Sequence, residues 1–216
     1  MDFYNLVIVI CVNALPLVLA ITLHEAAHGY VAKMFGDNTA YMMGRVTLNP
    51  AKHIDPMGTI AFPLLALLIG GIFFGWAKPV PVNFNNLRHP KRDMFWVAAA
   101  GPGSNVVQAI VWATVAKVLF DMPANAVATY WFQVAEAGIL VNVIFAILNL
   151  FPVLPLDGGR ILASLLPTRL SYAYQGTERY GMIILILLIV TGVLGSVMSP
   201  LVSIGVTLIY NAFGLQ

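Results

Sequence analysis

The pentapeptide HEAAH at residues 24–28 combines side chains that could form a hydrolytic metal centre. In a helix, positions i and i+4 lie on one face, so His24 and His28 can share one metal ion. Glu25 lies beside them, where its carboxylate can take a proton from a metal-bound water. The alternative is a pair of helical histidines satisfied by neighbouring polar groups. Ionisable groups within apolar helices are costly and usually functional, so the pattern favours a metal site.

A catalytic zinc site needs a third protein ligand as well as an open position for water. Asp157 stands out among the acidic residues, because it directly follows a long apolar segment in a proline-flanked DGG turn. The alternative role for Asp157 is the N-cap of a short helix that starts near Gly158. The residues alone leave both roles open.

The composition places this chemistry in a membrane. Of the 216 residues, 60% are hydrophobic and 9% are charged, and the mean hydropathy is +0.86. Soluble domains carry about 25% charged residues and could not bury so much apolar surface. These values exclude an ordinary cytosolic enzyme, a disordered chain and a nucleic-acid binder. The single cysteine, Cys11, excludes an intramolecular disulfide and a cysteine-rich zinc ribbon.

Apolar segments long enough to cross a bilayer must position the candidate residues. The sequence predicts an all-α polytopic membrane protein, a bundle of about five or six transmembrane or re-entrant helices in a single domain, residues 1–216. The catalytic core is expected at residues 3–167, with accessory C-terminal helices at residues 178–214. The expected apolar helices cover residues 3–35, 57–74, 93–120, 127–150, 180–197 and 201–214.

Two segments predict extended backbone. Residues 39–49 are rich in Thr, Tyr and Val around a central glycine, which is typical of a short membrane-associated strand or β-hairpin. Alternating prolines in residues 75–84 also enforce extension. An unwound substrate could then pair with an edge at residues 40–48 or 79–83.

Two separated motifs together resemble one family. HEAAH in an apolar helix, with NLFPVLPLDGG at residues 149–159, is similar to the HExxH and NxxPxxxxDG pattern of the site-2 protease family of intramembrane zinc metalloproteases. AGPGSN at residues 100–105 resembles the middle core helix of that family. The resemblance covers most of the chain, from about residue 15 to residue 167. It implies a minimal form without PDZ or CBS domains.

The resemblance implies an endopeptidase that hydrolyses peptide bonds within or near transmembrane segments of membrane proteins. It implies one Zn²⁺ per chain, held by His24, His28 and Asp157, with Glu25 as the catalytic acid and base. It also implies that Asn149 lies near the scissile carbonyl, where it could donate to the oxyanion. The expected partners are transmembrane substrates and the lipid bilayer, with no nucleic acid, and no oligomeric state is predicted.

Two other functions use the same residues. A membrane metal-ion transporter could pass ions through the His/Asp cluster, but it needs a polar pathway to both faces. The polar residues here concentrate at one end of the helices instead. A non-catalytic scaffold with a relic site is disfavoured, because Glu25 and all three candidate ligands are present.

Several other polar residues have open roles. Asn142 lies two helical turns before Asn149 and either lines the cavity or packs against another helix. Hydrogen bonding between helices is favoured for Asn105. Glu136 is expected near the aqueous edge, beside an interfacial aromatic belt. His53 is expected to be structural rather than a metal ligand.

The topology follows from where the ligands must meet. His24, His28 and Asp157 can share one zinc only if the ends of their helices lie on the same side of the membrane. Residues 57–83 must then dip into the membrane and return. This arrangement puts ten of the eleven basic residues on the cytoplasmic side and leaves Lys117 opposite, as the positive-inside rule favours. We expect a multi-pass plasma or inner membrane protein with an external N-terminus and a site near the cytoplasmic face.

Overall fold

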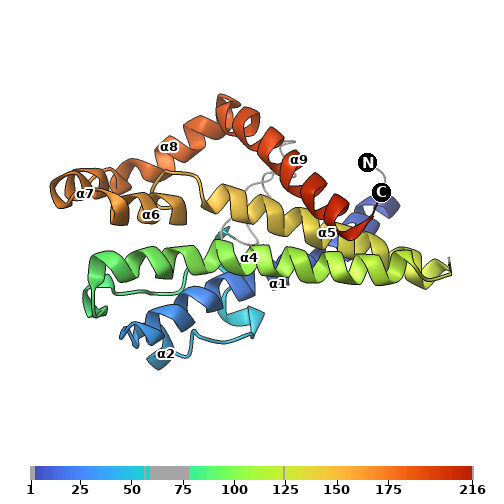
Figure 1. Cartoon of the computed structure of the whole chain (residues 1–216), viewed down its shortest axis with the longest axis horizontal. Coiled ribbons are helices and arrows are strands. Elements are labelled where there is room, and N and C mark those ends of the chain that lie inside the picture. Colours follow the sequence, from blue (N-terminus) through green and yellow to red (C-terminus); the bar gives the residue numbers. More distant parts are fainter. Residues whose placement is uncertain (1–2, 56, 59–77, 124, 216) are drawn as a thin grey trace.

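The computed structural model describes residues 3–55, 57–58, 78–123 and 125–215. The regular structure assigned in these residues is helical, and Figure 1 shows how the helices are arranged. The α-helices are α1 (Phe3–Met34), α2 (Thr39–Met42), α4 (Pro90–Phe120), α5 (Ala126–Asn149), α6 (Asp157–Leu165), α7 (Thr168–Gln175), α8 (Glu178–Val190) and α9 (Val193–Phe213). Two short 3₁₀ helices cover Pro50–Lys52 and Phe84–Asn86.

Four of these helices are long and apolar enough to cross a membrane: α1 from Val7 onward, α4, α5 and α9. The pair α7 and α8 is bent by 65° at its break and forms a fifth candidate if it is one span. For the described residues, the prediction of an all-α chain with several membrane spans is therefore confirmed at this coarser level, with four or five candidate spans where about five or six were predicted. The helix expected at residues 57–74, and most of the predicted re-entrant path at residues 57–83, lie outside the described residues.

The predicted β-hairpin at residues 39–49 is wrong. This segment forms the short helix α2 and a turn, because the Asp37 carboxylate accepts hydrogen bonds from the backbone and hydroxyl of Thr39. The helix ends at Met42, and the turn that follows contains Gly44, whose φ of +63° suits glycine, with the Arg45 N–H donating to the Ala40 carbonyl. Local side-chain and turn chemistry outweighed the β-propensity of Thr, Tyr and Val, which is a weak preference.

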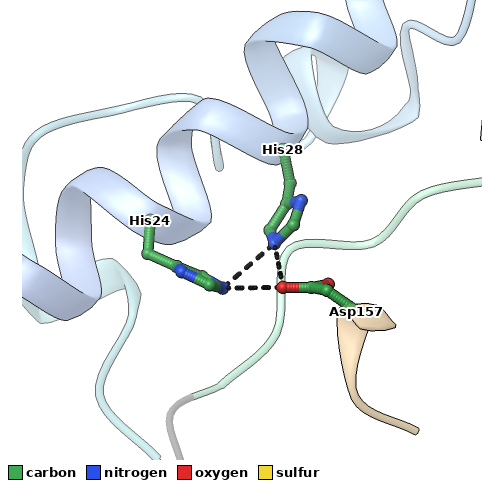
Figure 2. Close-up of side chains that lie close together, drawn as sticks. All are labelled: His24, His28 and Asp157. Atoms are coloured by element: carbon green, nitrogen blue, oxygen red, sulfur yellow. Dashed lines mark hydrogen bonds and ion pairs between the residues drawn. The ribbon is translucent and has the colours of Figure 1, made fainter. Parts of the chain in front are cut away.

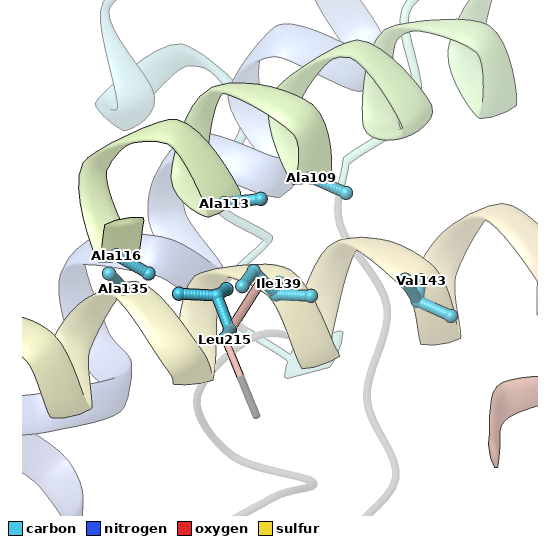
Figure 3. Packing of buried hydrophobic residues seen from close by; sticks show 7 residues of the cluster. All are labelled: Ala109, Ala113, Ala116, Ala135, Ile139, Val143 and Leu215. Atoms are coloured by element: carbon cyan, nitrogen blue, oxygen red, sulfur yellow. The ribbon is translucent and has the colours of Figure 1, made fainter. Parts of the chain in front are cut away.

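Three helices, α1, α4 and α5, pack against one another and form the centre of the molecule, and α9 lies on α4 and α5. Small residues allow the close approach of α4 and α5 (Figure 3). Ala109, Ala113 and Ala116 of α4 face Ala135 and Ile139 of α5, and all five side chains are buried.

Helix α4 begins near the C-terminal end of α1, which is the end closer to the HEAAH motif. The Arg88 N–H donates to the Phe35 carbonyl at 2.9 Å, and the Asn83 N–H donates to Asp37 at 2.7 Å. The chain therefore returns to this end of α1 before it enters α4. At the other end of the bundle, α5 begins at Asn125, whose side chain accepts from the Ala128 N–H as an N-cap.

Candidate active site

Three predicted ligands converge in the structure (Figure 2). His24 and His28 lie one turn apart on α1, and Asp157 is the first residue of α6. The Nε2 atoms of the two histidines are 3.1 Å apart, and Oδ2 of Asp157 lies 3.2 Å from His24 and 3.3 Å from His28. Both imidazoles are buried. Among the described residues, no other His, Cys, Asp or Glu side chains form such a cluster.

The DGG turn directs Asp157 at the histidines. Leu156, not Asp157, occupies the N-cap position of α6, so the carboxylate faces the centre of the cluster. The two glycines that follow allow the preceding loop to lie against the first turn of the helix. A Cβ on Gly158 would overlap the Leu150 carbonyl, and one on Gly159 would lie 2.6 Å from the Leu154 nitrogen.

Hydrogen bonds to the far side of each imidazole fix its tautomer. Nδ1 of His28 lies 2.7 Å from the carbonyl oxygen of Val97, which can only accept, so Nδ1 carries the proton. Nδ1 of His24 lies 2.7 Å from Oδ1 of Asn105 and donates to it in the same way. Both Nε2 lone pairs are consequently free to bind a metal ion.

A chain of amides holds Asn105 in place. Nδ2 of Asn105 donates to the Ala20 carbonyl at 3.3 Å and to Oδ1 of Asn142 at 2.9 Å. Nδ2 of Asn142 in turn donates to the Gly138 carbonyl at 2.9 Å. Backbone carbonyls therefore set both amide orientations, and both asparagines are fully buried. The network supports His24 from α4 and α5, a role that the spacing of the sequence did not reveal.

The AGPGSN segment of α4 lies directly against the two histidines. A Cβ on Gly101 would lie 2.6 Å from Nε2 of His24 and would overlap Nε2 of His28. Only glycine therefore leaves room for both rings at this position. One helical turn further along α4, Asn105 reaches Nδ1 of His24 from the same side.

The cluster fits a tetrahedral zinc ion. Zinc binds nitrogen and oxygen ligands at about 2.0–2.2 Å, which puts the ligands of a tetrahedron about 3.3 Å apart. The three observed separations lie between 3.1 and 3.3 Å. Two lone pairs and a carboxylate oxygen otherwise face one another without a proton between them, and Oδ2 of Asp157 has no hydrogen-bond donor among the described residues. A cation relieves this repulsion.

Glu25 lies outside the ligand set, as its expected role requires. Its Oε2 accepts a hydrogen bond of 2.7 Å from the backbone N–H of Val80. Asn149 is the last residue of α5, and its Nδ2 donates to the Phe145 carbonyl one turn back at 3.0 Å. The structure therefore places Asn149 before the loop that leads to Asp157, without bringing it into the cluster.

Two further polar residues lie away from the cluster. His53 is buried, and its Nε2 donates to the Thr47 carbonyl at 3.0 Å, which fits the structural role expected for it. Glu136 is half-buried and accepts a hydrogen bond of 3.0 Å from the Tyr210 hydroxyl, so it links α5 to α9. This link could not be predicted from a local pattern, because Tyr210 lies 74 residues from Glu136 in the chain.

The chain is similar to several bacterial proteins. It is 37% identical over 194 residues to "Putative zinc metalloprotease YwhC" of Bacillus subtilis, an alignment that covers 88% of this chain and 85% of that protein. It is 32% and 30% identical to two proteins named "Putative zinc metalloprotease Rip2", from Mycolicibacterium smegmatis and Mycobacterium tuberculosis. These alignments cover 80% and 79% of this chain, and 64% and 63% of the relatives.

The model of Peptidase family M50 matches residues 113–192, which include Asn149 and Asp157. No solved structure gives a significant match. The extent of the match to the Bacillus protein, together with the family model, is sufficient to assign the family. The chain belongs to peptidase family M50, the site-2 protease family.

Proposed function

We propose that the chain is an intramembrane zinc metalloendopeptidase that hydrolyses peptide bonds within or near transmembrane segments of membrane proteins. The observation that carries this proposal is the convergence of His24, His28 and Asp157 beside Glu25, in a chain with four candidate spans. The names of the matched relatives support a zinc metalloprotease. They give no support to the metal-transporter alternative.

His24, His28 and Asp157 would hold one zinc ion per chain. When bound at such a site, zinc polarises a carbonyl and lowers the pKa of its water to about 7. These three residues would supply three protein ligands, the number that is usual in catalytic rather than structural zinc sites. Asn105 and Val97 keep the two imidazoles in the tautomer that binding requires.

Glu25 is the proposed acid and base. It takes a proton from the attacking water and delivers it to the leaving amine. The Val80 N–H holds its carboxylate on the side of α1 that faces residues 78–83. Asn149 is the proposed donor to the oxyanion, since the Phe145 carbonyl accepts one of its two amide protons and the other makes no hydrogen bond within the described residues.

The substrate must unwind before it is cut. A transmembrane helix hides its peptide bonds in its own hydrogen bonds, so residues that weaken a helix near the cut, such as Gly, Pro or Asn, should promote cleavage. We also propose that the site lies near the cytoplasmic face of the cell membrane. The support is the distribution of basic residues, of which Lys117 alone lies at the far end of α4 from the site.

The test is zinc analysis of purified protein together with cleavage of a transmembrane peptide. Wild-type protein should bind zinc stoichiometrically and cleave the peptide. Glu25→Gln should retain zinc and lose cleavage, whereas His24→Ala, His28→Ala and Asp157→Ala should lose both. Glu136→Gln is the matched control, because within the described residues that glutamate bonds Tyr210, between α5 and α9, and no residue of the cluster. Near wild-type cleavage by Glu25→Gln, or zinc transport without cleavage, would overturn the proposal.

A further inference from the structure

Residues 78–83, here called the strap, run in extended form beside the HEAAH turn of α1. The backbone of the strap bonds to four residues from earlier in the chain, Glu25, Asp37, Arg45 and His53. The Lys78 N–H donates to the His53 carbonyl at 2.9 Å, and at the other end the Asn83 N–H donates to Asp37 at 2.7 Å. Both ends of the strap are thus anchored independently of its middle.

The anchor at the Asn83 end of the strap is the ionised carboxylate of Asp37. Burial raises the pKa of Asp37, but hydrogen bonds from Thr39, Asn83 and Asn86 outweigh burial, so the net pKa lies below its ordinary value. The side chain of Asp37 is fully buried. It therefore stays charged and holds Asn83 at neutral pH.

The middle of the strap lies tightly on α1. The Val80 side chain is buried against Gly29, where an added Cβ would lie 3.1 Å from Cγ1 of Val80. In this position the Val80 N–H points at Glu25 and donates to its Oε2 at 2.7 Å. The direction of this one peptide N–H therefore sets the position of the carboxylate.

The Arg45 guanidinium donates a hydrogen bond to the other side of the same Pro79–Val80 peptide group. Its Nη2 donates to the Pro79 carbonyl at 3.3 Å and to the Lys78 carbonyl at 2.9 Å. The Pro79 carbonyl and the Val80 N–H belong to one trans peptide unit, so they point in opposite directions. A guanidinium, a peptide group and the Glu25 carboxylate are consequently aligned, and each polarises the next.

The burial of Arg45 supports a structural role for its contact with the strap. Only 7% of Arg45 is exposed, although arginine is almost never fully buried unless it is paired. Its Nε has no hydrogen-bond partner among the described residues, which is a further cost of keeping the side chain there. Within the described residues, the two carbonyls of the strap accept the hydrogen bonds of its guanidinium.

We propose that Arg45 is a positioning residue for Glu25, acting through the Pro79–Val80 peptide. The inference rests on the proposed function, because it assumes that Glu25 is the acid and base. Without the guanidinium, the strap keeps its anchors at Lys78 and Asn83, but its central peptide can rotate. The carboxylate then loses its fixed direction, and a misplacement of about 1 Å can cost up to about 100-fold in rate.

The test compares Arg45→Met and Arg45→Lys with Lys52→Met. Lys52 is exposed and lies in the same loop region, so its variant removes one positive charge without touching the strap. We expect Arg45→Met to lower kcat by about 10- to 100-fold with little change in KM or zinc content. Arg45→Lys should recover part of kcat, because an ammonium can still donate to the two carbonyls, and Lys52→Met should match wild type.

A second measurement reports on the strap directly. A spin label on Val82→Cys, in a Cys11→Ala background, should become more mobile in Arg45→Met and stay unchanged in Lys52→Met. Unchanged kcat and label mobility in folded Arg45→Met, or an equal loss of kcat in Lys52→Met, would overturn the inference. If wild-type protein with bound zinc fails to cleave, the proposed function fails instead, and the label still reports whether Arg45 holds the strap.

Discussion

Oδ1 of Asn105 lies 2.7 Å from Nδ1 of His24, although 81 residues separate them in the chain. Asn105 is on α4, and its own amide is fixed by Ala20 of α1 and Asn142 of α5. All three central helices therefore take part in the hydrogen bonds of the Asn105 side chain, which bonds the candidate ligand His24. Because the amide orients the imidazole, the affinity for metal should depend on residues that do not touch it.

Asn105→Ala should lower zinc affinity by about 10- to 100-fold, the usual cost of losing a hydrogen-bond partner of a metal ligand. The His24 ring loses its acceptor and can rotate or change tautomer. Zinc titration of the purified variant with a competing chelator measures the change. Asn142→Ala should have a smaller effect, since Asn142 acts one step further away.

The control for Asn105 is Asn13→Ala on α1, because in the part of the chain that the structure describes Asn13 is outside the network and donates to the Val9 carbonyl. Its zinc affinity should match wild type. Equal affinities for Asn105→Ala and Asn13→Ala would assign Asn105 to helix packing alone.

Gly101→Ala should abolish tight zinc binding in a protein that still inserts and folds. The new methyl group would occupy the space of the two imidazoles, which cannot both keep their positions. Gly103→Ala is the matched control, because it lies in the same motif with nothing within 4 Å of an added Cβ. Both changes raise helix propensity by about 1 kcal/mol, so zinc content separates the clash from any effect on the helix. Normal zinc content in Gly101→Ala would contradict the packing.

Helices α7 and α8 contact the loop that leads to Asp157. An added Cβ on Gly181 of α8 would overlap the Leu154 carbonyl, and the Tyr174 hydroxyl of α7 donates to the Pro152 carbonyl at 3.0 Å. Gly181→Ala should therefore shift the loop and lower both zinc affinity and cleavage, from a position outside the cluster. Gly195→Ala on α9, where an added Cβ meets nothing within 4 Å, should leave both unchanged. Unaltered zinc affinity in Gly181→Ala would make α8 dispensable for the site.

The ligands could be predicted because each depends on a local pattern. His24 and His28 share a face through helical spacing alone, and Asp157 lies in a short motif with two glycines. The amide network could not be predicted, because Asn105 and Asn142 find each other only after α4 and α5 pack. The apolar lengths likewise predict spans but not which helices become neighbours.

Residues 79–83, before α4, show a different limit of prediction from sequence. Their prolines predicted an extended backbone at residues 75–84. In the described part of that range, residues 78–83 contain neither helix nor strand and a 3₁₀ helix begins at Phe84, and the edge expected at residues 79–83 is partly occupied. Glu25, Arg45 and Asp37 bond the backbone of this segment, and all three come from earlier in the chain. Residues 40–48 offered no strand because Asp37 directs them into a helical turn. Tertiary hydrogen bonds decided both outcomes, and sequence periodicity does not report them.

The last prediction concerns the orientation in the membrane. Arg88 bonds Phe35, so the segments on either side of residues 57–83 lie at the same end of the bundle as Asp157. In a Cys11→Ala background, single cysteines at the exposed positions Leu48, Asn85 and Arg169 should all react only with a reagent that reaches the cytoplasm. A cysteine at Met122, at the far end of α4, should react only from outside. Labelling of Leu48 and Asn85 from opposite sides would contradict the re-entrant path, and reversal of all four positions would keep that path while placing the site at the external face.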